Sequence, residues 1–183
     1  MDQNTHDTGT ESWYTGFDLW DTHGIHNQFP QMGSAEEVNA KLQDIGGRFG
    51  LVKIDTQNDQ AKFRDELKTR FTNGIDFAFI DGCHSYNGIK NDFDNVLPFM
   101  NPKGIIAFHD TAVIDGCREF IIDLRLGDNK FDITDFPYGT NERNCGVTLV
   151  TNPGFGQIKI DEICGSLSTP EEIYAKEDNY RRM

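Results

Sequence analysis

Residues 75–111 read IDFAFIDGCHSYNGIKNDFDNVLPFMNPKGIIAFHDT. The two apolar runs in this stretch, Ile75–Ile80 and Gly104–Phe108, have the length and composition of buried strands. The segment between them has apolar residues at helical spacing: Ile89, Phe93, Val96 and Leu97. A strand, a helix and a strand in this order form a right-handed crossover, so we predict two parallel strands.

Each apolar run ends in acidic or imidazole side chains. Asp81-Gly82-Cys83-His84 follows the first run, and His109-Asp110 ends the second. Because parallel strands have their carboxyl ends at the same edge of the sheet, we expect the two clusters to lie together. Open α/β sheets bind their ligands at this edge, so it is the predicted functional site.

Similar elements flank this stretch on both sides. The pattern predicts strands ending at Asp18 and Asp55, and a helix that starts with a capping box formed by Ser34 and Glu37. Further helices are predicted over Asp59–Phe71 and Asp115–Leu126, and later strands over Phe131–Thr134, Gly146–Thr151 and Gln157–Ile160. The predicted fold class is therefore α/β, a doubly wound, mostly parallel sheet with an antiparallel C-terminal hairpin.

The chain has the length of a single domain, with 183 residues. Residues 1–12 are predicted to be a polar tail, residues 13–165 the α/β domain, and residues 166–183 a C-terminal extension. Pro170 and the acidic residues after it are typical of a helix start, so this extension could be helical.

Composition narrows the class of partner. The chain has 30 acidic and 17 basic residues and a formal charge of −13, which disfavours nucleic acid and anionic membrane surfaces. No apolar run approaches the about 20 residues of a membrane span, and the N-terminal sequence lacks a secretory signal, so we expect a cytoplasmic protein. The four cysteines form no CxxC pair, so their spacing predicts neither a zinc site nor a disulfide framework.

The strand-end motifs GFDLW, VKIDTQ and IDGCHSY, with the later FHD and CGVTLV, resemble class I S-adenosylmethionine-dependent methyltransferases. The pattern IDGxHxY followed by a helix acid and a strand ending in HD is similar to small-molecule O-methyltransferases of the macrocin O-methyltransferase and cephalosporin-hydroxylase-like groups. The resemblance covers residues Trp13 to Val150 and implies a Rossmann-like sheet.

The chain departs from this family at one place. Family members begin with a central strand and a glycine-rich turn that holds the methionine part of the cofactor, and nothing before Trp13 matches them. Three explanations are open: the chain is truncated, a partner chain or a second copy supplies the strand, or the Trp13 strand pairs directly with the Ile75 strand. We therefore predict that the chain alone binds S-adenosylmethionine weakly or not at all.

The resemblance also implies a set of cofactor-binding residues. The acid at Asp18 would accept hydrogen bonds from both ribose hydroxyls, Leu19 would pack on the adenine, and Asp55 with Thr56 would lie at the adenine edge. An acid solvated in a loop is an equally good interpretation of Asp18. The predicted cofactor-binding residues are Asp18, Leu19, Asp55, Thr56, Asp81 and Gly82.

Asp81, His109 and Asp110 form the predicted metal site. Two carboxylates suit Mg²⁺, and His109 as a third ligand would favour a softer ion such as Mn²⁺ or Fe²⁺. Such an ion would hold a substrate hydroxyl and lower its pKa. The alternative is structural: His109 bonds a backbone carbonyl, and Asp110 caps the following helix.

His84 is the predicted general base, with Asp81 beside it. An imidazole can accept a proton at neutral pH, and a hydroxyl must lose its proton to attack a sulfonium methyl group. His84 could instead be a hydrogen-bonding loop residue, with Tyr86 or Asp92 as the base.

The favoured function is a metal-assisted, S-adenosylmethionine-dependent O-methyltransferase that acts on a hydroxylated small molecule, such as a sugar or secondary metabolite. The alternative is a catalytically silent binding or assembly module with a methyltransferase fold. Metal-dependent hydrolysis with the same carboxylates ranks last.

Overall fold

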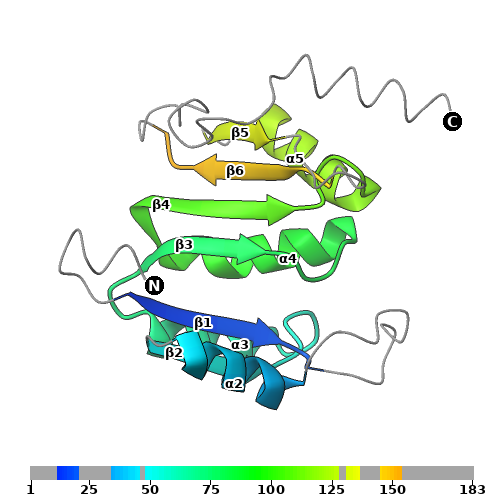
Figure 1. Ribbon diagram of the computed structural model, residues 1–183. Coiled ribbons are helices and arrows are strands. Elements are labelled where there is room, and N and C mark those ends of the chain that lie inside the picture. The colour runs from blue at the N-terminus through cyan, green and yellow to red at the C-terminus, as the bar shows by residue number, and fades with distance from the viewer. Residues whose placement is uncertain (1–11, 21–33, 46–47, 128–130, 137–144, 154–183) are drawn as a thin grey trace, which may run out of the picture. The chain divides into compact units, whose positions relative to one another are not determined.

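The computed structural model describes residues 12–20, 34–45, 48–127, 131–136 and 145–153, which carry the helices and strands of Figure 1. The chain divides into two compact units, Met1–Phe63 and Arg64–Met183. The predicted strand at residues 157–160 and the predicted terminal helix lie outside the described residues.

The first unit contains two parallel strands, β1 (Trp13–Asp18) and β2 (Arg48–Lys53), connected through helix α2 (Ala35–Ile45). The predicted capping box starts α2: the Ser34 amide donates to the Glu37 carboxylate at 3.0 Å, and the Glu37 amide donates to the Ser34 hydroxyl at 3.3 Å. Ser34 and Glu37, which predicted this helix, therefore also accept hydrogen bonds from backbone amides at its start that have no partner within the helix.

Helix α3 (Gln60–Arg70) begins at the end of the first unit. Phe63, on its first turn, is buried, and its ring packs edge-on against that of Phe17 of β1, with 5.1 Å between the ring centroids. An aromatic pair therefore joins the start of the helix to the first strand.

The second unit contains a four-stranded sheet in the order β3-β4-β6-β5. Strands β3 (Ile75–Ile80) and β4 (Met100–His109) are parallel, as predicted, and helix α4 (Tyr86–Val96) with the 3₁₀ turn η1 (Leu97–Phe99) connects them. Strand β6 (Val147–Thr151) pairs antiparallel with both β4 and β5 (Asp132–Phe136). The predicted antiparallel hairpin is thus present at the edge of a sheet that also has parallel strands.

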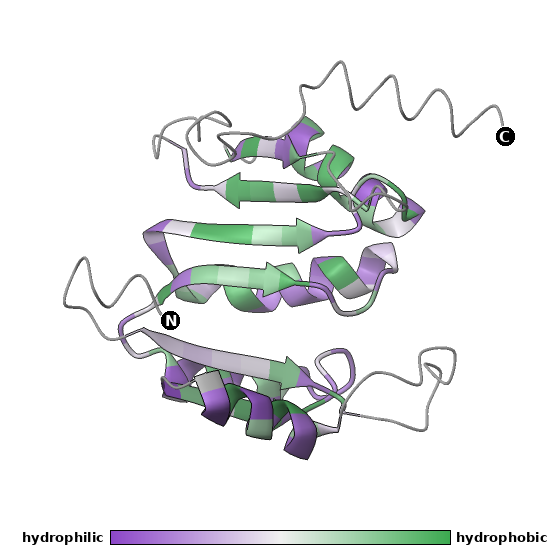
Figure 2. Ribbon diagram, in the orientation of Figure 1, coloured by the Kyte–Doolittle hydropathy of each residue, from purple (hydrophilic) through white to green (hydrophobic). Residues whose placement is uncertain are grey.

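The core of the second unit lies between this sheet and helices α4 and α5 (Asp115–Leu126). The rings of Phe93 from α4, Phe108 from β4 and Phe120 from α5 lie within 5.9 Å of one another, centroid to centroid. Figure 2 shows hydrophobic residues along β4 and β6, the strands in the middle of the sheet. This packing holds the carboxyl ends of β3 and β4 in a fixed arrangement.

Strand β1 belongs to a two-stranded sheet with β2, and β3 belongs to the four-stranded sheet. The three explanations for the departure from the family remain predictions. None of the described helices combines the length and hydrophobicity that crossing a bilayer requires.

Candidate functional site

The structure brings the predicted acid and imidazole residues of the second unit together. The parallel register places Ile80 of β3 opposite Phe108 of β4, so the residues that follow them, Asp81 and His109, lie side by side. Polar side chains therefore gather at the carboxyl edge of these strands, as the sequence predicted.

Two imidazoles and two carboxylates form this group, which we call the acid–imidazole cluster: Asp81, His84, His109 and Asp110. His84 Nε2 lies 3.2 Å from Asp110 Oδ2 and 3.6 Å from Asp81 Oδ1. His109 Nδ1 lies 3.2 Å from Asp110 Oδ1 and 3.3 Å from Asp81 Oδ1. Each imidazole thus contacts both carboxylates. The two carboxylates repel each other, and this repulsion is reduced only if they share a cation or a proton.

The cluster is accessible to a ligand on one side. The side chains of His84 and Asp81 are 45% and 41% exposed, whereas Asp110 is 14% exposed. Asp110 therefore lies at the base of the cluster, and His84 and Asp81 lie at its surface. A substrate that approaches from solvent can reach both His84 and Asp81.

Helix α5 fixes the backbone of the loop that carries His84. A Cβ at Gly116 would lie 2.5 Å from the His84 carbonyl oxygen and 2.6 Å from the Tyr86 amide nitrogen, too close for any side chain. Ser85 caps α4 by accepting a hydrogen bond from the Gly88 amide at 3.1 Å. The loop is therefore held at both of its neighbouring helices, and a larger residue at position 116 would displace it.

Asp110 has a left-handed backbone conformation, with φ of +59°. Few residues other than Gly, Asn and Asp adopt this conformation readily. The alternative role of Asp110, as the cap of the following helix, is wrong, because Ile114 is the N-cap of α5 and no side chain caps that helix. The carboxylate of Asp110 instead faces the two imidazoles.

The structural alternative for His109 was a hydrogen bond to a backbone carbonyl, and the Nδ1 atom of its ring makes no such bond among the described residues. Its Nδ1 is buried and makes no hydrogen bond in the described structure, although two carboxylate oxygens lie within 3.3 Å. The ring also contacts Phe79 of β3, with 6.0 Å between the centroids. The imidazole is thus held by packing, with Nδ1 directed at the carboxylates.

The two alternative bases lie elsewhere. The Tyr86 hydroxyl donates a hydrogen bond to Asp123 of α5 at 2.7 Å, and this bond raises the pKa of Tyr86 above its ordinary value. Asp92 is buried, and its carboxylate lies beneath Gly82, where a Cβ would be 3.3 Å from Asp92 Oδ2. Of the three candidates, His84 is the one that belongs to the acid–imidazole cluster.

In the first unit, the predicted cofactor residues gather at the carboxyl ends of β1 and β2. The Ile54 amide donates to the Asp18 carbonyl at 2.9 Å, which extends the parallel pairing to the residues next to Asp55. The Asp18 carboxylate accepts a hydrogen bond from the Trp20 amide at 2.8 Å through Oδ1, and Leu19 is 45% exposed. Asp18 and Leu19 are therefore accessible to a ligand.

The Asp55 carboxylate accepts hydrogen bonds from residues of the turn that follows it. Its Oδ2 accepts from the Asn58 side-chain amide at 2.8 Å, and its Oδ1 accepts from the Asn58 and Gln57 backbone amides, each at 3.0 Å. These bonds lower the pKa of Asp55, and the bond from the Asn58 side chain has the largest effect. The Thr56 hydroxyl accepts from the Gln57 side-chain amide at 3.4 Å. Asp55 is thus a poorer side-chain ligand than Asp18.

Sequence reasoning missed Cys145 as a member of the site. One ligand atom each from His109, Asp110 and Cys145 lies within 4.8 Å of the others, and a second such group is Asp81, His84 and Asp110. Cys145 is 35 residues after Asp110, so no short motif joins them. The sequence held no local signal for it, because Cys145 reaches the site through the antiparallel pairing of Val147 with His109 across the sheet.

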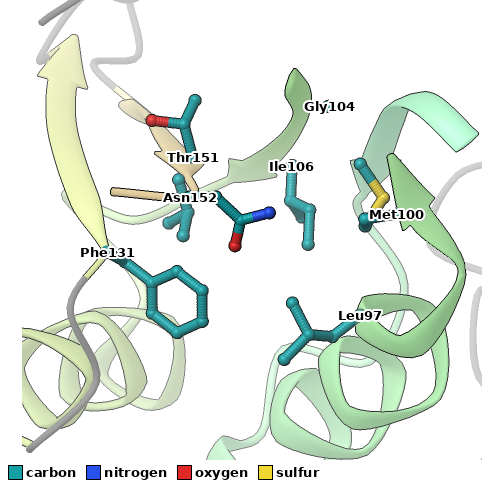
Figure 3. A pocket seen from close by; sticks show the side chains of 8 residues that line it. Leu97, Met100, Gly104, Ile106, Phe131, Thr151 and Asn152 are labelled. Carbon is teal, nitrogen blue, oxygen red and sulfur yellow. The ribbon is translucent and has the colours of Figure 1, made fainter. Parts of the chain in front are cut away.

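The cavity in Figure 3 is not part of this site. It has a volume of about 10 Å³, enough for one water molecule, and the labelled Leu97, Met100 and Phe131 lie around it. Met100 begins β4, whereas His109 ends it. The cavity therefore lies towards the opposite end of the strand from the acid–imidazole cluster.

Curated proteins are similar to this chain over part of its length. A curated relative, an uncharacterized protein of Acanthamoeba polyphaga mimivirus, is 27% identical over 124 residues. That match covers 60% of this chain and 55% of the relative, so the chain spans about half the relative's length. An uncharacterized protein of Sinorhizobium fredii is 35% identical over 51 residues, 28% of this chain and 6% of that protein.

Solved structures with the same fold are O-methyltransferases. TomG from Streptomyces achromogenes, solved in complex with SAM, aligns with a TM-score of 0.54 and 13% identity over 78% of this chain and 73% of TomG. The O-methyltransferase from Bacillus cereus, in complex with SAH, aligns with a TM-score of 0.51 and 12% identity over 76% of this chain and 74% of that protein. At this identity the likeness shows the fold, and it confirms the predicted Rossmann-like α/β class.

The family model described as "Methyltransferase domain" matches residues 2–111, a range that includes Asp18 and the acid–imidazole cluster. The match extends over more than half of the chain and confirms the predicted resemblance to S-adenosylmethionine-dependent methyltransferases. The chain therefore belongs to the methyltransferase domain family.

Proposed function

We propose that this chain forms the catalytic part of an S-adenosylmethionine-dependent O-methyltransferase that acts on a hydroxylated small molecule, a sugar or a secondary metabolite. The observation that carries the proposal is the acid–imidazole cluster at the carboxyl edge of β3 and β4, in a chain of the methyltransferase domain family. An exposed imidazole next to carboxylates is suited to remove a proton from a hydroxyl group.

His84 is the general base in this proposal. Its Nε2 accepts the proton of the substrate hydroxyl, and the carboxylates of Asp81 and Asp110, at 3.6 and 3.2 Å, stabilise the imidazolium that results. The oxygen left by the proton attacks a methyl carbon, and the new oxygen–carbon bond forms as the sulfur–carbon bond breaks. The packing of Gly116 against the His84 backbone keeps the base in place during this step.

S-adenosylmethionine supplies the methyl group as an electrophilic sulfonium. Asp18 would accept hydrogen bonds from the ribose hydroxyls, since its carboxylate is exposed and offers acceptors only. Leu19, which is 45% exposed, would cover the adenine. Thr56, Asp81 and Gly82 complete the proposed cofactor set, and Asp55 fits it less well because its own turn uses both carboxylate oxygens.

The cluster also fits a divalent cation. Two carboxylates converge on the buried Nδ1 of His109, which makes no hydrogen bond within the described structure. Asp81, His109 and Asp110 would hold the ion; the carboxylates suit Mg²⁺, and the imidazole favours Mn²⁺ or Fe²⁺. When bound, such an ion supplies a Lewis acid that makes a hydroxyl easier to deprotonate.

The substitution Asp110→Asn tests the proposal. Asn tolerates the left-handed backbone but lacks the charge, so we expect methyl transfer from labelled S-adenosylmethionine to fall by about 100-fold or more. Mg²⁺ or Mn²⁺ should raise the melting temperature of the wild-type protein and not that of this variant. Asp94→Asn, the same chemical change on the exposed face of α4, is the matched control. Equal activity and equal metal response in the two variants would overturn the proposal.

A binding or assembly module remains the alternative, and the sequence supports it by having no GxGxxG turn. Such a module would bind its partner equally well before and after the substitution Asp110→Asn, and it would show no metal-dependent stabilisation. A homo-oligomer, a partner chain that supplies a further strand, and a cytoplasmic location remain predictions from the sequence.

A further inference from the structure

Cys145 lies next to two members of the acid–imidazole cluster. We infer that His109, Asp110 and Cys145 form a second ion-binding set, selective for a thiol-binding divalent cation of the zinc class. One ligand atom from each residue, which is Sγ for Cys145, lies within 4.8 Å of the others. Binding at this set does not depend on the proposed methyltransferase activity.

The backbone holds Cys145 in this position. Its carbonyl accepts a hydrogen bond from the Ala112 amide at 3.0 Å, which joins the start of β6 to the loop after β4. Gly146 has φ of +72°, and a Cβ there would lie 2.7 Å from the Ala112 Cβ. The close approach and the antiparallel pairing of His109 with Val147 together fix Cys145 beside Asp110.

A second observation points to a ligand at the same place. His109 Nδ1 is buried and makes no hydrogen bond within the described structure. It lies 3.2 Å from Asp110 Oδ1. A buried ring nitrogen loses its interaction with water, and this one faces carboxylate oxygens without a hydrogen bond to either. A cation between the imidazole and the carboxylate would supply the interaction that Nδ1 lacks.

The types of ligand decide which ion fits. Thiolate and imidazole are typical zinc ligands, whereas Mg²⁺ prefers oxygen atoms and retained waters. Tetrahedral zinc has ligand bonds of about 2.0–2.3 Å, so its ligand atoms lie roughly 3.3–3.8 Å apart. The His109–Asp110 pair, at 3.2 Å, is already close to this spacing, and a contraction of about 1 Å brings in the third ligand. The Cys145 thiol releases its proton to solvent on binding.

This set shares His109 and Asp110 with Asp81, His109 and Asp110, the group that the proposed function assigns to a harder ion. Asp81 and Asp110 also form a group with His84, in which the ligand atoms lie within 4.8 Å of one another. Since the two ions would compete for His109 and Asp110, zinc would displace Mg²⁺ or Mn²⁺ and inhibit methyl transfer. This consequence for activity, unlike zinc binding itself, depends on the proposed function.

Cobalt binding by the full chain tests the site directly, because Co²⁺ replaces Zn²⁺ and its bond to a thiolate gives a charge-transfer absorption in the near ultraviolet. We expect this band in the wild-type protein, its loss in Cys145→Ser, and zinc affinity at least about tenfold weaker in that variant. Cys83→Ser is the matched control, since Cys83 is an exposed cysteine outside both ion-binding sets, and it should keep the band. No band in the wild type, a band that survives Cys145→Ser, or a band lost in Cys83→Ser would overturn the inference.

Asp81→Asn separates the two ion-binding sets. It should keep the cobalt band and lose the stabilisation by Mg²⁺ or Mn²⁺, because Asp81 belongs to the group of the harder ion and not to the set of His109, Asp110 and Cys145. Loss of the cobalt band in this variant would show that a single site binds both ions, against the inference. A cobalt band in a protein that shows no methyl transfer when it is assayed with Mg²⁺ or Mn²⁺ and without cobalt would contradict the proposed function and leave the zinc-class site standing.

Discussion

Acidic residues follow strands in both units of this chain, but the two units use them differently. In the first unit, Asp55 accepts three hydrogen bonds from its own turn, and Asp18 accepts one from the Trp20 amide. In the second unit, Asp81 and Asp110 instead face the imidazoles of other segments. An acid after a strand is thus a local turn former in one place and part of a cluster with imidazoles in the other. The partner, rather than the acid itself, decides the role.

The largest effect that would test this comparison is expected at His84. Replacing His84 with Ala removes the proposed base, so kcat for methyl transfer should fall by about 100-fold to 10,000-fold. Binding of S-adenosylmethionine, followed by calorimetry, should change little, because the proposed role of His84 concerns the acceptor hydroxyl. A fall of less than about threefold in kcat would assign the imidazole a structural role.

A smaller effect is expected from Asp18→Ala in the first unit. Hydrogen bonds to a charged group contribute about 1.5–3 kcal/mol each, so affinity for S-adenosylmethionine should fall by roughly 10-fold to 100-fold. The dissociation constant measured with the complete protein should rise, while kcat at saturating cofactor should stay close to that of the wild type. A drop in kcat with unchanged affinity would mean that both units contribute to the chemical step.

The smallest effect is expected from Asp55→Ala, which removes the acceptor of the β2–α3 turn. The free energy of unfolding should decrease by about 1 kcal/mol, as for loss of a helix N-cap. Denaturant unfolding measures this change, and Asp65→Ala, at an exposed acid within α3, is the control. An unchanged free energy would show that the hydrogen bonds of Asp55 contribute nothing measurable.

The same residue gives a pH dependence of known sign. The pKa of Asp55 is lower in the folded protein than in the unfolded chain, so its stabilising effect is fully present above the unfolded value of about 4. It is lost as the pH falls through the lower, folded value. The difference in stability between the wild type and Asp55→Ala should therefore shrink below about pH 4. A difference that grows on acidification would contradict this assignment.

The sequence predicted the local elements well because their signals are local. The Ser34–Glu37 capping box, the apolar positions of α4 and the span of α5 all follow from residues within a few turns of each other. The meeting of Asp81 with His109 was also predictable, because the crossover rule makes β3 and β4 parallel.

Two features could not be predicted in the same way. Cys145 reaches Asp110 through the antiparallel pairing of β6 with β4, and the register of that pairing depends on long-range packing. The interpretation of Asp110 as a helix cap was reasonable from the sequence, because Asp is a common cap. It was wrong because Ile114 is the cap of α5, after a turn in which the Ile114 amide donates to the Asp110 carbonyl.

Position 110 has two independent requirements: a residue that tolerates the left-handed backbone, and a ligand for the proposed ion. The turn accepts Gly, Asn or Asp at little cost, whereas an ion requires a negatively charged ligand, and Asp alone satisfies both. If the proposed cation binds here, a homologue with Asn or Gly at this position would retain the fold of the second unit and lose that cation. Position 110 would then be a simple sequence marker that separates metal-binding members of such a family from members that keep only the scaffold.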